Sequence, residues 1–196
     1  SRETFRCLEE YENIIINASK KLNLIGKSTI SNIWERHILD SYQVIDFIDK
    51  NNTELFDLGS GAGFPGLILS IASKDKKIPL KVNLIEKSSK KADFLKKTIK
   101  KLNLNAEVIC EDILEDEKNI PGEFFIARAF KPLPVLLKLM HNQAKNFKKF
   151  IIFLGKTGKN ELLHASKTWD IQYKQSISIT SSDSLIIEIN KLKKIN

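Results

Sequence analysis

The sequence predicts an α/β fold in which a mostly parallel sheet carries helices on both faces and closes with an antiparallel C-terminal hairpin. Three observations predict this fold. Short apolar runs of strand length alternate with helical windows in the middle of the chain. A glycine-rich turn joins the first of these runs to the helix that follows it. The last two strand-like segments follow one another with only a short turn between them.

Residues 1–50 are predicted to form a helical cap ahead of the sheet. In two stretches, apolar side chains recur at the spacing that places them on one face of a helix. The second stretch runs from Asn32 to Phe47. The apolar residues are Leu8, Tyr11, Ile15, Ala18 and Leu22 in the first stretch, and Trp34, Ile38, Tyr42 and Ile45 in the second.

Five strands are predicted from apolar runs at residues 55–58, 82–85, 108–110, 124–127 and 150–153. The helical windows between them favour parallel pairing. One window combines an apolar stripe with a face of lysines that are either solvated or in contact with RNA phosphates. The stripe is Ala92, Leu95, Ile99 and Leu102, and the lysines are Lys90, Lys91, Lys96, Lys97, Lys100 and Lys101.

The pattern changes after the fifth predicted strand. A short helix is expected near Glu161–Trp169, followed by strands at Ile171–Ile179 and Ser184–Lys191. Residues 180–183 are turn-prone, so these two strands are predicted to pair as an antiparallel hairpin.

The composition indicates one domain with a basic surface. With 42% apolar residues among 196, the chain can bury one substantial core, and no break in composition suggests a second. We therefore expect a single domain over residues 1–196, in which the cap at 1–50 precedes an α/β core at 51–196. A net charge of +8 and a pI near 9.3 favour encounter with a polyanion such as ribosomal RNA, although heavy lysine use can also reflect codon bias.

Membrane, export, disulfide and metal functions are not indicated. No run of about 18 apolar residues is present and the N-terminus lacks a signal-peptide pattern, so we expect a cytoplasmic protein without a membrane partner. Cys7 and Cys110 have neither the number nor the spacing for a disulfide framework or a zinc site, and partly buried reduced thiols are expected. We expect a monomer with no bound metal.

The most informative segment is a strand that runs into a glycine-rich turn and then a helix. It reads Phe56-Asp57-Leu58-Gly59-Ser60-Gly61-Ala62-Gly63-Phe64-Pro65-Gly66. The glycines allow a sharp turn and the close approach of a ligand. The part from Gly61 to Gly66 also fits the dinucleotide fingerprint G-x-G-x-x-G, so the loop predicts a Rossmann-like core with a nucleoside cofactor without deciding which one.

Two residues favour S-adenosylmethionine over NAD. Asp57 lies at the strand end, where a dinucleotide fold normally has an apolar residue and where a carboxylate could attract the ammonium of a methionine moiety. Pro65 removes a backbone N–H from the start of a helix whose donors would otherwise hold a pyrophosphate. Glu86 ends the second predicted strand at the distance expected of a ribose-binding carboxylate, a feature that both cofactors share.

Together with its surroundings, the loop resembles the RsmG (GidB) family of ribosomal RNA methyltransferases over nearly the whole chain. The most specific stretch is Arg36-His37-Ile38-Leu39-Asp40-Ser41, because general methyltransferases share the loop but not this preamble. The other matching stretches are residues 22–25, 57–66, 127–130 and 153–156. The resemblance implies a class I S-adenosylmethionine-dependent methyltransferase fold with seven strands. It also implies methylation of a guanine N7 in 16S ribosomal RNA, free or in the small ribosomal subunit.

The resemblance also implies the site residues. Gly59 and Phe64 would contact the cofactor, and Gly61 and Gly63 would shape the loop. Together with Asp57 and Glu86, which are expected from the residues themselves, the expected cofactor site is Asp57, Gly59, Gly61, Gly63, Phe64, Glu86, Ile113, Leu114 and Arg128. Ile113 and Leu114 would border the adenine. The residues implied to position the substrate are Arg128, Lys156, Arg36 and His37. Two departures from the family stand out: Asp112 replaces a frequent arginine, and Gly155-Lys156 replaces Lys-Gly after the fifth strand.

The acceptor implied by the family needs no general base, because guanine N7 already carries an in-plane lone pair. Methyltransferases that act on exocyclic amines usually have an Asp/Asn-Pro-Pro-aromatic motif after the fourth strand, whereas this chain has Ala-Arg-Ala-Phe-Lys-Pro at residues 127–132. Phe130 is expected either to stack on an unstacked base or to pack at the rim. The alternatives are a methyltransferase for another RNA, a protein or a small molecule, and a non-catalytic NAD- or nucleotide-binding module.

Overall fold

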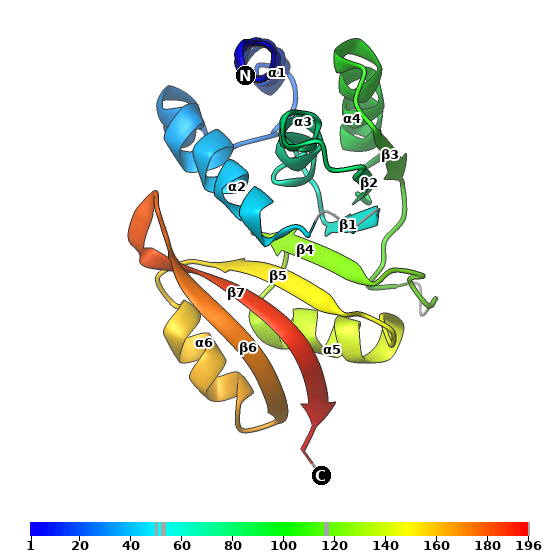
Figure 1. The fold of residues 1–196 in the computed structure, drawn as a ribbon, viewed down its shortest axis with the longest axis vertical. Coiled ribbons are helices and arrows are strands. Elements are labelled where there is room, and N and C mark those ends of the chain that lie inside the picture. The colour runs from blue at the N-terminus through cyan, green and yellow to red at the C-terminus, as the bar shows by residue number, and fades with distance from the viewer. Residues whose placement is uncertain (50, 52–53, 116–117, 196) are drawn as a thin grey trace.

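The computed structural model describes residues 1–49, 51, 54–115 and 118–195, and it contains a seven-stranded sheet with helices on both faces (Figure 1). The strand order is β3-β2-β1-β4-β5-β7-β6. β1 to β5 pair in parallel, and β7 runs antiparallel to both β5 and β6. The strands are β1 (Glu54–Leu58), β2 (Lys81–Ile85), β3 (Ala106–Ile109), β4 (Phe124–Arg128), β5 (Lys149–Leu154), β6 (Trp169–Ser178) and β7 (Ser181–Lys194). The predicted sheet and its closing hairpin are confirmed.

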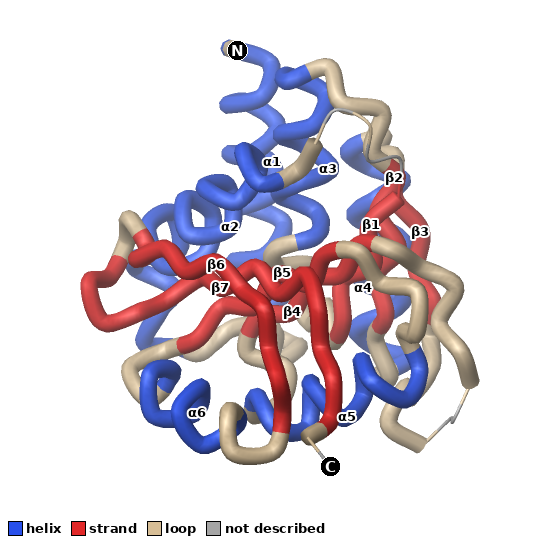
Figure 2. The backbone as a smooth tube through the Cα atoms, turned by 60° about the horizontal axis from the view of Figure 1, so that its bottom comes forward, coloured by secondary structure: helices blue, strands red, loops and turns tan. Residues whose placement is uncertain are grey.

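Two layers of helices cover the sheet. The helices α1 (Arg2–Ser19), α3 (Gly66–Lys76) and α4 (Ser89–Leu102) lie on one face, and α5 (Leu133–Gln143) and α6 (Gly158–Ala165) lie on the other (Figures 1 and 2). The remainder of the cap is a chain of short segments: η1 (Lys27–Asn32), a π-helical turn η2 (Trp34–Leu39), α2 (Asp40–Tyr42) and η3 (Gln43–Phe47).

The central strands β1, β2, β4 and β5 are buried on both faces, which explains why they read as continuous apolar runs. In β4, Phe125 and Ala127 pack into the core beneath α5, whereas Ile126 points into the core shared with α1 and α3. Because successive side chains of a strand point to opposite faces, Leu55 and Asp57 of β1 also lie on the α3 side. This alternation determines where the polar side chains at the strand ends are placed.

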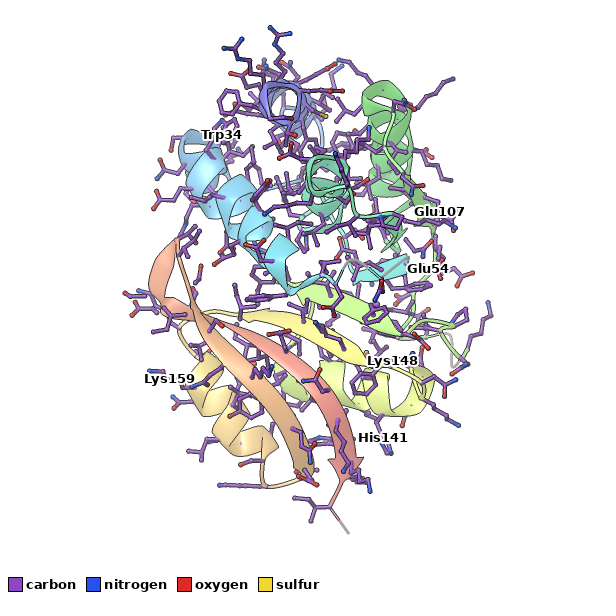
Figure 3. All side chains as sticks on the ribbon, viewed as in Figure 1. Trp34, Glu54, Glu107, His141, Lys148 and Lys159 are labelled. Atoms are coloured by element: carbon purple, nitrogen blue, oxygen red, sulfur yellow. The ribbon has the colours of Figure 1, made fainter. Side chains whose placement is uncertain are left out.

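The N-terminal helix packs directly against the glycine loop. Tyr11 of α1 is fully buried, and its hydroxyl donates a hydrogen bond of 2.7 Å to the Ala62 carbonyl. Trp34 lies on the outer side of the cap, where its ring stacks 5.2 Å from Phe5 and its Nε1 donates to Glu12 at 2.7 Å (Figure 3). The cap thus supports the loop from behind.

Several details differ from the sequence-based expectations. Trp169 begins β6 instead of ending a helix, because its side chain is buried against α5. Within the described residues, no helix connects β3 to β4, and α3 is buried on all sides of its first two turns. Cys110 is exposed, not partly buried. Lys50, the expected end of the cap, lies outside the described residues. No helix among the described residues is long and apolar enough to cross a membrane.

Candidate functional site

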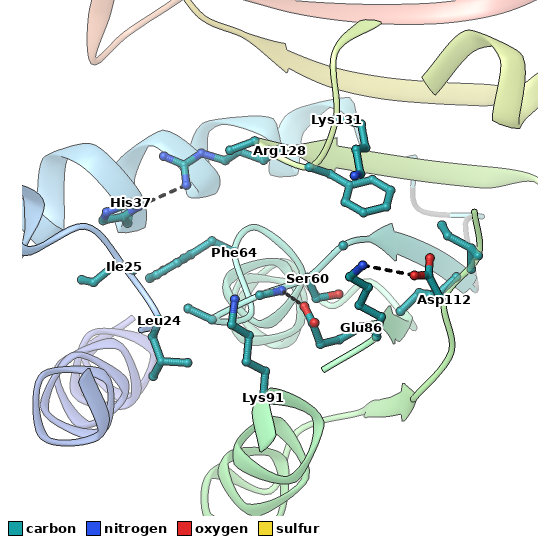
Figure 4. A pocket seen from close by; sticks show the side chains of 18 of the residues that line it. Leu24, Ile25, His37, Ser60, Phe64, Glu86, Lys91, Asp112, Arg128 and Lys131 are labelled. Atoms are coloured by element: carbon teal, nitrogen blue, oxygen red, sulfur yellow. Dashed lines mark hydrogen bonds and ion pairs between the residues drawn. The ribbon is translucent and has the colours of Figure 1, made fainter. Parts of the chain in front are cut away.

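A cavity of about 440 Å³ opens at the carboxyl ends of β1, β2 and β4, beneath the cap (Figure 4). This is the edge of a parallel sheet at which ligands usually bind. Leu24, Ile25 and His37 of the cap lie at one end of the cavity and Asp112 lies at the other. The lining residues are Leu24, Ile25, Gly26, His37, Gly59, Ser60, Gly61, Ala62, Phe64, Ile85, Glu86, Lys87, Lys91, Glu111, Asp112, Ile113, Arg128, Ala129, Phe130 and Lys131.

The glycine loop forms the floor of the cavity in a conformation that requires glycine. Gly59, Gly61 and Gly63 have φ angles of 71°, 57° and 99°, in the left-handed region that other residues rarely adopt. A Cβ on Gly59 would lie 2.1 Å from the Phe130 ring. Phe130 therefore packs directly over the loop, and its exposed edge lines the cavity.

Asp57 lies beneath the loop instead of facing the cavity. Its side chain is fully buried, its Oδ2 accepts a 3.0 Å hydrogen bond from the Gly66 amide, and its Oδ1 has no partner. Burial raises the pKa of Asp57 to about 7, although the Gly66 hydrogen bond opposes the shift. The expected contact between Asp57 and a methionine ammonium is not supported by this position, since strand alternation turns the carboxyl toward α3.

The hydrogen bond between Gly66 and Asp57 also bears on whether the N-terminus of α3 could bind a pyrophosphate. Pro65 has no N–H, Gly66 donates to Asp57, and the Leu67 amide donates to the Gly63 carbonyl at 2.8 Å. The first donors of α3 are therefore used inside the protein, whereas a dinucleotide site needs them free. The helix N-terminus does not fit a pyrophosphate, and the cavity fits a nucleoside cofactor without one.

We expect Asp57→Asn to change how stability depends on pH. The folded-state pKa is raised to about 7 from 3.8, so the wild-type chain loses stability as pH rises between these values, because only the unfolded state releases its proton there. The variant cannot ionise. Its melting temperature relative to wild type should therefore rise from about pH 4 to about pH 7. A constant difference over this range would contradict a raised pKa.

Glu86, at the end of β2, faces the cavity and also holds the loop. Its Oε2 accepts from the Gly61 amide at 2.9 Å and its Oε1 accepts from the Ser88 amide at 2.8 Å. A carboxylate has about four lone-pair positions, so each oxygen can still accept a hydroxyl. Glu86 is only 7% exposed, and it lines the cavity.

The opposite wall of the cavity is formed by residues 111–113, which come after β3 in the chain. Ile113 is buried and lines the cavity, whereas Leu114 packs into the core beneath α5 and does not line it. Asp112 stands at the cavity edge, where its Oδ1 accepts from the Leu114 amide at 3.2 Å and its Oδ2 pairs with Lys87 at 3.1 Å. These two contacts lower the pKa of Asp112, so it is a carboxylate where the family often has a cation.

Arg128, at the end of β4, is held by three groups of the cap. Its Nε donates to Asp40 Oδ2 at 3.0 Å, its Nη1 donates to His37 Nδ1 at 3.1 Å, and its Nη2 donates to the Arg36 carbonyl. The guanidinium also lies 5.9 Å from the centre of the Phe153 ring. The motif at residues 36–41 is therefore an arginine-binding segment, and Asp40, to which the sequence analysis assigned no role, is its charged member.

His37 is neutral in this arrangement. Burial and the Arg128 cation lower its pKa to about 4. Since arginine can only donate, Nδ1 accepts, and Nε2 carries the proton and donates to Thr29 Oγ1 at 2.9 Å. The ring stacks 5.0 Å from Phe64. His37 therefore links the cap, the glycine loop and Arg128.

Four of the expected site residues do not line the cavity, in addition to Asp57. The Arg36 side chain is exposed and only its carbonyl contributes, and Gly63 and Leu114 shape the walls from behind. Lys156 is 84% exposed and pairs with Asp183 of β7 at 3.5 Å. Lys91 of the predicted lysine face lies at the cavity. Two further lysines at the cavity, Lys87 and Lys131, had no predicted role, and their positions after the ends of β2 and β4 were the available signal.

Comparison with known proteins agrees with this geometry. A family model described as GidB, rRNA small subunit methyltransferase G, matches residues 4–188. The ribosomal RNA small subunit methyltransferase G of Pelagibacter ubique (strain HTCC1062) is 43% identical over 197 residues, which cover 100% of this chain and 92% of that protein.

Solved structures share the fold at lower identity. A SAM-dependent methyltransferase from Aquifex aeolicus has a TM-score of 0.57 and 17% identity, covering 81% of this chain and 92% of that one. TrmK of M. capricolum, solved with S-adenosyl-homocysteine, has a TM-score of 0.55 and 19% identity, covering 77% of this chain and 67% of that one. The fold is that of class I S-adenosylmethionine-dependent methyltransferases. With a family match over nearly all of its length, the chain belongs to the GidB family, rRNA small subunit methyltransferase G.

Proposed function

We propose that this chain transfers the methyl group of S-adenosylmethionine to N7 of a guanine in 16S ribosomal RNA. Family membership over residues 4–188 is the observation that carries the proposal. The cavity supports it, because the glycine loop and Glu86 suit a nucleoside while the N-terminal donors of α3 are already used. Ribosomal RNA as substrate makes the cytoplasm the expected compartment.

The residues that would hold the cofactor follow from the cavity. Gly59 and Gly61 allow it to approach the loop backbone, Phe64 provides an apolar wall, Glu86 would accept the ribose hydroxyls, and Ile113 would border the adenine. When bound, S-adenosylmethionine supplies an electrophilic methyl group on a sulfonium. Asp57 and Gly63 act from below as supports of the loop.

The chain would then act by positioning. The N7 lone pair would accept the methyl group, so the ring would become cationic and no proton would have to leave. Holding the acceptor in line and close is the main contribution available to the protein. Arg128 has donors left after its three cap contacts and lies at the cavity, so we assign to it the contact with the guanine O6 or a phosphate. Lys87, Lys91 and Lys131 would attract the RNA backbone.

The product identifies the acceptor atom. Small-subunit RNA that lacks the modification is methylated with labelled S-adenosylmethionine, reduced with borohydride and treated with aniline. We expect cleavage at one guanosine, because only the cationic N7-methylated ring is open to reduction. Labelled RNA that resists cleavage would place the methyl group on another atom. Calorimetry against NAD tests the non-catalytic alternative, and we expect no binding.

The single-turnover rate should lack the steep rise with pH that a general base imposes. His37 supports this expectation, since its pKa of about 4 leaves it neutral over the physiological range. Asp57 has a pKa of about 7, so its ionisation could produce an inflection that is unrelated to a general base, and the Asp57→Asn variant controls for this effect. An inflection near pH 7 that disappears in Asp57→Asn would report this buried carboxyl, whereas an inflection that persists would indicate a base at the site.

We expect Glu86→Ala to weaken binding of S-adenosylhomocysteine by about 1–3 kcal/mol, the cost of hydrogen bonds to a charged group. The structure adds a second effect, because the two amides that Glu86 accepts from would lose their partner. The melting temperature should fall by a few degrees, roughly 2–4 °C per kcal/mol. Calorimetry and thermal unfolding measure both quantities, and an unchanged dissociation constant would reject the assignment.

A further inference from the structure

The Asp40 carboxylate joins the C-terminal hairpin to Arg128. The Asp40 side chain is 13% exposed, and its Oδ2 accepts from Arg128 Nε. Its Oδ1 accepts from Ser178 Oγ at 2.8 Å, Thr180 Oγ1 at 2.9 Å and Gln43 Nε2 at 2.9 Å. Ser178 ends β6 and Thr180 lies in the turn before β7, so residues separated by about 140 positions meet at this carboxylate.

These donors fix the rotation of the carboxylate. With Oδ1 held on the hairpin side, Oδ2 faces Arg128 and accepts the Nε hydrogen along one direction. Gln43 completes the clamp, because its Nε2 also donates to Ser178 Oγ at 3.0 Å and its Oε1 accepts from the Ile179 amide at 3.0 Å. The orientation of the guanidinium plane therefore depends on the turn of the hairpin.

Ser178 and Thr180 direct their hydroxyls inward although the turn between β6 and β7 is largely exposed. Ile177 and Ile179 are 65% and 67% exposed, whereas Ser178 between them is 4% exposed. A turn that only reversed the chain would not need a buried hydroxyl directed at a carboxylate of the cap. Each oxygen of the Asp40 carboxylate already accepts one hydrogen bond, from Arg128 or from Gln43. The hydroxyls of Ser178 and Thr180 therefore restrict the orientation of a carboxylate that is already paired.

We propose that Ser178 and Thr180 are positioning residues that orient Arg128 at the cavity through Asp40, which rests on the proposed function in that Arg128 contacts the RNA. The side chains of Ser178 and Thr180 do not line the cavity. Their effect is to hold one arginine in the geometry that the guanine requires, where small displacements reduce the rate strongly.

The test compares the double variant Ser178→Ala, Thr180→Val with wild type. Thr180→Val keeps the shape of the side chain, and exposed Ser176→Ala on the same strand is the matched control. Two readouts are independent of RNA: the solvent exchange of the Arg128 Nε proton by NMR, and the dissociation constant of S-adenosylhomocysteine. The third is the single-turnover methylation rate at saturating RNA.

We expect the double variant to speed Nε proton exchange, to keep the dissociation constant within about twofold, and to lower the rate roughly tenfold, the effect of about one hydrogen bond. Ser176→Ala should match wild type, and Thr180→Ser, which keeps the hydroxyl, should retain most of the rate. An unchanged exchange rate overturns the proposal, and so does equal loss of rate and cofactor binding, which would indicate general unfolding. Failure of wild type to methylate the RNA would reject the proposed function alone, because proton exchange still tests the orientation of Arg128.

Discussion

Gly61→Val is expected to abolish binding of S-adenosylhomocysteine while the chain stays folded. A Cβ at this position meets only the Gly59 carbonyl oxygen, at 3.8 Å, and Gly61 lines the cavity. The Cβ of the valine would therefore enter the space of the ligand with only an ordinary contact to the protein. The φ angle of 57° adds strain of about 1–2 kcal/mol, which lowers the melting temperature by only a few degrees, on the order of 2–8 °C.

Calorimetry and thermal unfolding separate these two effects. Gly155→Val is the matched control, because a Cβ there meets nothing within 4 Å and Gly155 does not line the cavity, so binding should persist. Gly66→Ala is the opposite case, since its Cβ would lie 2.4 Å from Leu84 and 2.6 Å from Asp57 and should destabilise the fold itself. Binding to Gly61→Val at wild-type strength would mean that the ligand does not approach this loop.

The fold was predictable because its main signals are local. Parallel strands buried on both faces are continuous apolar runs, and the glycine loop requires residues that tolerate positive φ, which few sequences supply together. The stripe of α4 also followed from spacing, and its Ala92, Leu95 and Leu102 are buried as expected. The end of α6 was misplaced: the helix ends at Ala165, and Trp169 begins β6 with its side chain buried, in agreement with the strand preference of tryptophan.

The site was less predictable because its contacts are long-range. Asp57 was assigned to the cavity from its position at a strand end, although its alternation with Leu55 already places it on the α3 side. Asp40 was part of a recognised motif without a role, because its partners Arg128 and Ser178 are 88 and 138 residues away. Lys156 illustrates the limit of motif matching, since the reversed order of Gly155-Lys156 leaves its side chain exposed and paired with Asp183.

Arg128→Met is expected to have the largest effect of any single substitution at the site. It removes one partner of a mostly buried ion pair, in which the side chains of Arg128 and Asp40 are 17% and 13% exposed. Breaking such a pair costs about 3–5 kcal/mol, because the remaining carboxylate stays buried without its cation. The melting temperature should fall by on the order of 10 °C, and methylation of small-subunit RNA should fall by at least about 100-fold.

Stability and positioning can be separated by removing the remaining charge. Asp40→Asn combined with Arg128→Met leaves no uncompensated carboxylate, while the amide oxygen can still accept from Gln43 and the hairpin hydroxyls. The double variant should regain most of the lost melting temperature, a coupling that a double-mutant cycle measures directly. The methylation rate should stay as low as in Arg128→Met, since no donor faces the guanine. If the rate returned together with stability, Arg128 would act only by attaching the cap to β4, and the assignment of an RNA contact to Arg128 would be rejected.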